Sequence, residues 1–106
     1  MHMLTGKWKI TAQTPLGTMD LIADFVASED ATTFTGSVFD EKNNKTYEVM
    51  NGMLDGYHIS YDMVIKFGLV PFNFHLEGEY TDEGTCRGEG KALKMEGTYE
   101  GYKLAE

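Results

Sequence analysis

Residues 57 to 80 constrain the fold more than any other part of the chain, because apolar and polar side chains alternate there almost without interruption. The apolar set comprises Tyr57, Ile59, Tyr61, Met63, Ile65 and Phe67 before a short loop, and Val70, Phe72, Phe74, Leu76 and Tyr80 after it. A period of two is that of a half-buried strand. A turn at Gly68-Leu69 sets Phe67 opposite Val70 and Tyr61 opposite Leu76, so that one register buries the whole set. This pattern predicts an antiparallel hairpin with an aromatic inner face.

The first forty residues predict three more strands that share one apolar face. Turn signals recur about every ten residues, as expected of an all-β sandwich or barrel, and no segment has helical periodicity. The first strand places Trp8, Ile10 and Ala12 inward and ends at Thr14-Pro15-Leu16-Gly17. Pairing with residues 19–27 is expected to set Trp8 opposite Phe25. A third strand around 34–38 then continues the same face, with Phe34 opposite Phe25.

The segment from 46 to 57 leaves two alternatives open. A fourth strand is expected near residues 46–50, after the polar turn at 40–45. Asn51-Gly52 and Asp55-Gly56 are both strong turn signals. The chain therefore has either a hairpin with a bulge or two successive kinks before the strand that begins at Tyr57.

The last third of the chain predicts a thin wall opposite a thick one. A three-residue turn with Gly84 in the left-handed position leaves Arg87, Glu89 and Lys91 outside, since a two-residue turn would bury these three charges. The inward residues are then Cys86, Gly88, Gly90 and Ala92. A final strand near 98–104 carries Tyr99 and Tyr102.

About eight strands in sequential order predict a single all-β domain, 1–106, whose antiparallel meander closes into an up-and-down barrel of the lipocalin or streptavidin kind. Such a barrel is either just filled by its own side chains or holds one small ligand. An internal space well above ~100 Å³ with a mouth to solvent would favour a ligand, and room for only one or two waters would contradict it.

Composition narrows the possible partners. Seventeen acidic residues against nine basic ones give a formal net charge of −8, and the lysines are scattered, so nucleic acid is not expected as a partner. The only cysteine, Cys86, excludes an internal disulfide and Cys-rich zinc patterns and is expected to be a buried thiol. The N-terminus does not resemble a signal peptide, and no stretch approaches the ~20 apolar residues of a membrane span. We therefore expect a soluble cytoplasmic protein without a membrane partner.

One polar cluster on the outer face of the long hairpin carries possible chemistry. The register sets Asp62 opposite His75, Ser60 opposite Glu77 and His58 opposite Glu79. Two histidines and three acids suit a divalent metal. Solvated cross-strand pairs are the favoured interpretation, so no metal, cofactor or catalytic residue is predicted here.

Short motifs spread over nearly the whole chain resemble those of small bacterial lipocalin-like, or calycin-type, β-barrel proteins. The motifs are Gly6-Lys7-Trp8-Lys9-Ile10, Thr14-Pro15-Leu16-Gly17, Phe34-Thr35-Gly36, Leu54-Asp55-Gly56, Leu76-Glu77-Gly78 and Tyr99-Glu100-Gly101-Tyr102-Lys103. The resemblance implies a small barrel that carries an apolar molecule, and implies no catalytic residue. Streptavidin-like barrels share the Gly-x-Trp opening, but Trp8 is the only tryptophan here, so biotin binding is not expected.

The function expected from the sequence is non-catalytic binding of a small hydrophobic or aromatic ligand inside the barrel. The expected pocket residues are Trp8, Phe25, Tyr61, Met63, Phe72, Phe74 and Tyr80. Met19, Met63 and Met95 are flexible enough to line such a pocket. The alternative is a filled barrel that acts as an interaction or self-association module, with a possible homodimer, through its acidic outer sheet.

Overall fold

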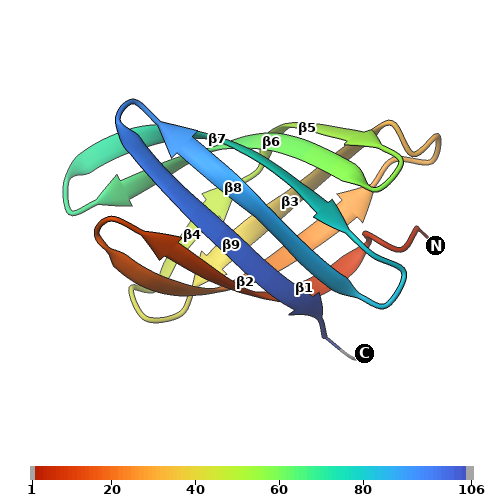
Figure 1. Ribbon diagram of the computed structural model, residues 1–106, viewed down its shortest axis with the longest axis horizontal. Helices are drawn as coiled ribbons and strands as arrows, with labels where there is room; N and C mark the ends of the chain where they lie inside the picture. The colour runs from red at the N-terminus through yellow and green to blue at the C-terminus, as the bar shows by residue number, and fades with distance from the viewer. Residues whose placement is uncertain (1, 105–106) are drawn as a thin grey trace.

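The computed structural model describes residues 2–104, and these form only strands and turns (Figure 1). The strands are β1 (Gly6–Thr14), β2 (Gly17–Ala27), β3 (Thr33–Asp40), β4 (Lys45–Glu48), β5 (Met50–Asp55), β6 (His58–Phe67), β7 (Val70–Tyr80), β8 (Thr85–Ala92) and β9 (Met95–Lys103). The expected all-β class is confirmed. Among residues 2–104 there is no helix with the length and apolar character needed to span a bilayer.

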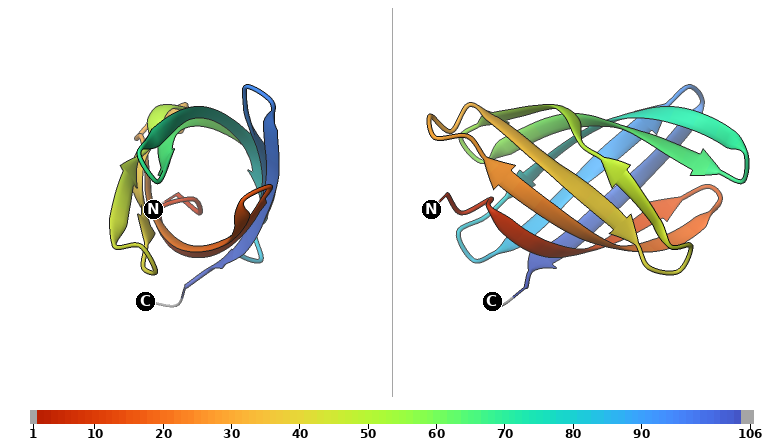
Figure 2. Two further views of the ribbon diagram at one scale, coloured as in Figure 1. Left: turned by 90° about the vertical axis from the view of Figure 1, so that its left-hand side faces the viewer. Right: turned by 180° about the vertical axis from the view of Figure 1, so that it is seen from behind.

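Eight of the strands close into a barrel (Figure 2). The order around it is β1, β2, β3, β5, β6, β7, β8 and β9, and β9 pairs with β1 again. All these pairings are antiparallel, as expected for an up-and-down barrel. The ninth strand, β4, pairs with β3 alone and leaves the barrel wall. The ladder between β5 and β6 ends at Met50 and Asp62, so a seam separates β4 from the last five residues of β6.

The long hairpin has the predicted register. Phe67 lies opposite Val70, Ile65 opposite Phe72 and Tyr61 opposite Leu76. Two residues of the predicted apolar face are nevertheless exposed, Tyr57 and Val70. Tyr57 belongs to the turn before β6, because Asp55 already pairs with His58, and Val70 lies at the tip of the hairpin, beyond the core.

The predicted register of the first two hairpins was wrong by two residues. Trp8 lies opposite Ala23 rather than Phe25, and Phe25 lies opposite Gly36 rather than Phe34. In the first hairpin the cause is a tight turn, in which Thr14 pairs with Gly17 and only two residues lie between them. In the second hairpin the ladder extends to Ala27, which pairs with Phe34. A shift of two residues keeps every side chain on its expected face, so the core was predicted correctly although the partners were not.

The chain uses both of the turn signals between 46 and 57. Val49 interrupts the strand after β4, and the register of β5 against β6 shifts between Met50 and Met53, as in a β-bulge. Asn51 in this bulge has a φ of 53° and Gly56 in the following turn has a φ of 61°. A bulge and a tight hairpin therefore follow one another.

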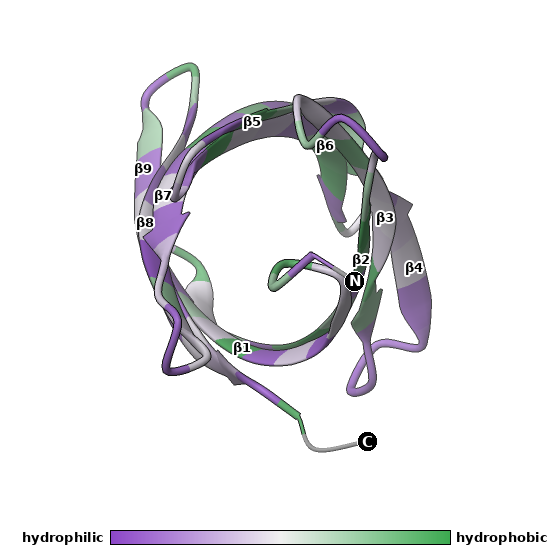
Figure 3. Cartoon of the chain, turned by 90° about the vertical axis from the view of Figure 1, so that its right-hand side faces the viewer, coloured by the Kyte–Doolittle hydropathy of each residue, from purple (hydrophilic) through white to green (hydrophobic). Residues whose placement is uncertain are grey.

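The two ends of the barrel differ. We call the end that carries the turns 14–17, 40–45, 67–70 and 92–95 the open end, and the other the closed end. Residues 2–5 curl across the closed end (Figure 3). Leu4 is fully buried there, and its carbonyl accepts a hydrogen bond of 2.9 Å from the indole nitrogen of Trp8. This segment acts as a plug at the closed end.

Candidate functional site

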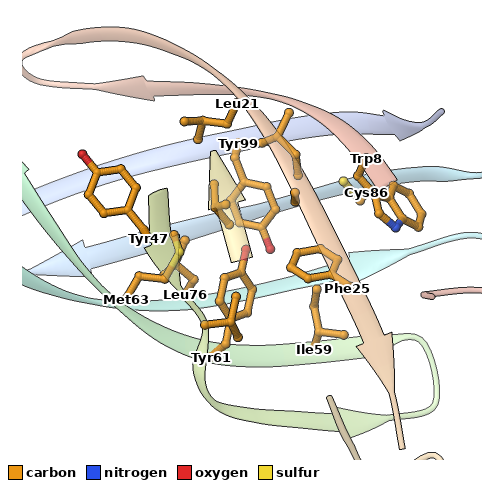
Figure 4. Close-up of a cluster of buried hydrophobic side chains, with 14 of the residues drawn as sticks. Trp8, Leu21, Phe25, Tyr47, Ile59, Tyr61, Met63, Leu76, Cys86 and Tyr99 are labelled. Carbon is orange, nitrogen blue, oxygen red and sulfur yellow. The ribbon is translucent and has the colours of Figure 1, made fainter. Parts of the chain in front are cut away.

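A cavity of about 50 Å³ lies in the lumen, toward the open end. Its lining is almost entirely apolar and comes from strands all around the barrel. The lining residues are Ile10, Ala12, Met19, Leu21, Ala23, Val38, Tyr61, Met63, Ile65, Phe74, Leu76, Gly90, Gly97, Thr98 and Tyr99. Figure 4 shows part of this cluster, in which Tyr61 and Tyr99 approach from opposite walls. The lumen is thus neither completely filled nor as roomy as the ~100 Å³ that would by itself favour a ligand.

Tyr99 explains how the thin wall is filled. A Cβ atom added at Gly78 would collide with the hydroxyl of Tyr99, and one added at Gly88 would collide with its ring. The two glycines therefore provide the space in which the tyrosine ring lies flat against the sheet. The thin wall predicted from Gly88 is real, and a side chain from β9 covers most of it.

The hydroxyl of Tyr99 is the one buried side-chain polar atom among residues 2–104 that has no hydrogen-bond partner. It faces the hydroxyl of Tyr61 across the lumen (Figure 4), and although the pair lies outside ideal hydrogen-bond geometry, the interaction of the two hydroxyls contributes to the pKa shifts of both phenols. Burial raises the pKa of both phenols well above the ordinary value, so both remain neutral.

Aromatic and methionine side chains pack beside the cavity, toward the open end. The ring of Phe67 packs edge-on against Phe72 at 5.6 Å and against Phe74 at 6.4 Å between centroids. Met19 and Met95 are half-buried beside the core. Methionine has three rotatable bonds, so these two side chains pack adaptably beside the cavity.

The seven predicted pocket residues occupy different parts of the lumen. Tyr61, Met63 and Phe74 line the cavity. Phe72 does not line the cavity and packs against Phe67 near the turn between β6 and β7.

The remaining three, Trp8, Phe25 and Tyr80, are buried but do not line the cavity. Trp8 is bonded to the plug at the closed end, and the Tyr80 hydroxyl donates a hydrogen bond of 2.8 Å to the Gly56 carbonyl in a turn there. The ring of Phe25 is 5.9 Å from that of Tyr61, in edge contact. These three residues pack one half of the barrel and leave the other half for the cavity.

Sequence reasoning missed Tyr99 as a site residue, although a signal for it was present. Tyr99 and Tyr102 are three positions apart, so an alternating strand must place them on opposite faces. The pairing of Gly88 with Tyr99 continues the inward row of β8. The expectation that Met19 and Met63 line the interior agrees with the cavity, whereas Met95 packs beside it.

The outer polar cluster forms a chain of hydrogen bonds rather than isolated pairs. Asn51 donates to Asp62 at 2.9 Å, and His75 contacts Asp62 at 2.7 Å and Glu77 at 3.4 Å. His58 contacts Glu77 at 3.1 Å instead of the Glu79 that lies opposite it.

Each polar side chain in this hydrogen-bonded cluster has a partner within the cluster and is accessible to solvent. Hydrogen bonds from Asn51 and His75 lower the pKa of Asp62, and the hydrogen bond to Asp62 raises the pKa of His75. No group of three or more His, Cys, Asp and Glu side chains in residues 2–104 has the arrangement of a metal site. The cluster therefore joins β5, β6 and β7 on the outside of the barrel.

Cys86 is buried in the wall, as predicted. Burial raises the pKa of its thiol to about 12, so the thiol stays protonated and unreactive at neutral pH.

A shallow groove crosses the outer face of β7, β8 and β9, and its lining is mainly acidic. Its charged residues are Glu77, Glu79, Arg87, Glu89 and Glu100. Glu77 lies directly opposite Glu89, whereas Arg87 lies between Glu79 and Glu100. The groove therefore has an excess of negative charge around one cation.

Comparison of the chain with protein-family models, with curated proteins and with solved structures gave no match.

Proposed function

We propose that this barrel binds a small, mostly apolar molecule with one hydrogen-bonding group, held in the lumen near the open end. The observation that carries the proposal is the apolar cavity in the lumen, whose wall includes the facing tyrosines Tyr61 and Tyr99. Ligand sites are typically apolar hollows with a few polar groups that fix orientation. The motifs that resemble lipocalin-like barrels support the same role. A lone buried thiol suits the reducing cytoplasm.

The size of the cavity limits the ligand. At about 50 Å³ it is roughly a third of the ~150 Å³ cavity that accepts benzene. A guest of a few heavy atoms fits as the side chains stand, and a larger one requires Met19, Phe67 and Phe72 to rotate outward. These three are only half-buried, so their rotation disrupts little of the core.

Methionine methyl groups offer a direct test, because they lie both inside and outside the barrel. With ¹³C-methyl methionine, straight-chain alcohols and carboxylic acids of increasing length are titrated and followed by NMR. We expect the signals of Met19 and Met63, which line the cavity, to shift in a saturable way. The exposed Met50 and Met53 serve as controls and should not move. Absence of saturable shifts at Met19 and Met63 across the series would overturn the proposal.

The role of the hydroxyl is tested by Tyr99→Phe. Loss of one neutral hydrogen bond is expected to weaken binding of an alcohol up to roughly tenfold, while a matched hydrocarbon binds equally well. Tyr102→Phe, which removes an exposed hydroxyl from the same strand, is the control. Equal binding of the alcohol by both variants would show that Tyr99 does not contact the guest.

A second function, docking of a protein partner, is favoured only by the acidic groove on β7, β8 and β9. If two copies met through this groove, Glu77 and Glu89 of each copy would face acidic residues of the other and repel them. The groove therefore favours a basic partner over self-association. Such a complex would dissociate as salt is added, whereas lumen binding of an uncharged guest would not.

A further inference from the structure

The open end of the barrel carries three leucines that the core does not use. Leu69 and Leu93 are each 96% exposed and Leu16 is 63% exposed. They lie at the tips of the turns β6–β7, β8–β9 and β1–β2, and we call them the leucine tips. In the left panel of Figure 2 the turns of this end lie around the ring of strands that encloses the lumen. Three separate hairpins thus expose a large apolar side chain on the same side of the molecule.

Backbone geometry argues against a purely structural role for one of them. Leu93 has a φ of 51° in a turn with two central residues, where glycine, asparagine or aspartate is normally found. A branched side chain in this region costs roughly 1 kcal/mol. The backbone at Leu93 is therefore strained, although the leucine side chain is not buried. Backbone strain that burial does not offset is characteristic of functional sites.

Charge is distributed unequally between the two ends. Five of the nine basic residues lie in or beside the turns of the open end, namely Lys42, Lys45, Lys66, Lys91 and Lys94. The acidic residues at this end are Glu41, Glu96, which is 3.9 Å from Lys91, and the buried Asp40. The turns of the closed end contain five acids, namely Glu29, Asp30, Asp55, Asp82 and Glu83. The basic residues beside them are Lys7 and Lys103, and the Lys103 ammonium donates a hydrogen bond to the Met3 carbonyl. A molecule with a net charge of −8 thus presents a locally positive end.

We propose that the open end docks on an anionic lipid bilayer, with the leucine tips inserted among the acyl chains and the surrounding lysines against the headgroups. Apolar insertion combined with attraction of lysines to acidic lipids is the established basis of reversible membrane binding. The acidic closed end is repelled by the same surface and so fixes the orientation.

A second copy is a poor occupant, because two open ends would bring their lysines together. The sequence-based expectation of no membrane partner considered only spanning segments. This proposal does not depend on a guest in the lumen.

Vesicle flotation tests the proposal without any ligand. The purified chain is mixed with phosphatidylcholine vesicles with or without phosphatidylglycerol at low ionic strength. We expect it to float with the anionic vesicles only, and to be released by added salt. Failure to float with phosphatidylglycerol vesicles, or equal flotation with both kinds, would overturn the proposal.

Matched variants identify the surface. Leu16→Ser, Leu69→Ser and Leu93→Asn are expected to lower the partition coefficient by roughly tenfold or more each, because each removes a leucine from the acyl region. Val26→Ser and Met53→Ser remove side chains that are 52% and 55% exposed elsewhere on the barrel and should have no effect. Leu93→Asn should not lower stability, since asparagine tolerates the positive φ, so its loss of binding is not a folding defect. If the leucine variants bind vesicles as well as the wild type does, the proposal is overturned. It is also overturned if Val26→Ser and Met53→Ser weaken vesicle binding as much as the leucine variants do.

The orientation has its own test. In Leu69→Trp, phosphatidylglycerol with brominated acyl chains is expected to quench the new indole, whereas Trp8, buried at the closed end, stays unquenched in the wild type. Quenching of Trp8, or dimerisation that is lost in the leucine variants, would contradict docking of the open end on lipid.

Discussion

At the scale of single residues, the interior depends on which positions lack a side chain. Gly88 and Gly90 are both inward on β8, two positions apart, yet their surroundings differ. A Cβ at Gly88 would collide with the Glu77 carbonyl and the Tyr99 ring, whereas a Cβ at Gly90 would meet Leu76 Cγ at 3.3 Å. One glycine is required by a rigid neighbour and the other lies beside a cavity.

Gly88→Ala is therefore expected to lower the free energy of unfolding by about 1–3 kcal/mol, because the backbone and a buried ring must move. Gly90→Ala is the matched control and should change it by less than about 1 kcal/mol, since the Leu76 side chain is able to adjust. Urea unfolding of both variants measures the difference. Equal costs would show that the Tyr99 ring is not held against Gly88.

At the scale of strands, the pairing was predicted correctly where the assumed loop length was right, although both hairpins turn through two residues. Alternation over 57–80 predicted the partners of β6 and β7 because only a two-residue loop lies between them. At Thr14-Pro15-Leu16-Gly17 the same reasoning assumed a longer loop, and an error of two residues left all faces correct, so the hydrophobic pattern had no means of detecting it. The cavity was not predictable in detail, because its position depends on where Tyr99 from β9 meets residues from strands far away in the sequence.

The hydrogen-bonded chain on β6 and β7 is expected to stabilise the sheet over a limited pH range. Folding lowers the pKa of Asp62, so the contribution of Asp62 to the free energy of unfolding is present above the ordinary value of 3.8 and is lost as the pH falls. Folding raises the pKa of His75, so the contribution of His75 to the free energy of unfolding is complete below pH 6.5 and is lost as the pH rises through the pKa of the folded state. The pair should be strongest between these limits, and worth at most about 1 kcal/mol because both groups are exposed.

NMR titration of the His75 ring tests this coupling. In Asp62→Asn the pKa of His75 should move back toward 6.5, whereas Asp24→Asn on β2 should leave it unchanged. A His75 pKa that is the same in wild type and Asp62→Asn would mean that the contact does not persist in solution.

At the scale of the whole molecule, the ends of the barrel have different roles. The closed end is stabilised by the plug, and the open end carries the cavity and the leucine tips. Neither arrangement was predictable from local sequence pattern. Leu16, Leu69 and Leu93 lie far apart along the chain, and only the meander brings them to one side.

Leu4→Ala tests the plug. Removal of a fully buried leucine is expected to cost about 2–5 kcal/mol of unfolding free energy, a large part of the stability of a domain of this size. Met3→Ala, at the exposed neighbouring position, should change stability by less than about 0.5 kcal/mol. Thermal and urea unfolding measure both, and similar small effects would mean that residues 2–5 do not seal the barrel.

Because β4 leaves the wall, one side of the barrel is expected to open more easily than the rest. Between β4 and the end of β6 the two edges share no ladder, and Met50, Val64 and Lys66 only flank the gap. Widening the circumference there breaks fewer backbone hydrogen bonds than at any complete strand pair. The gap between β4 and the end of β6 is thus the place in the wall where separation of the strands costs least.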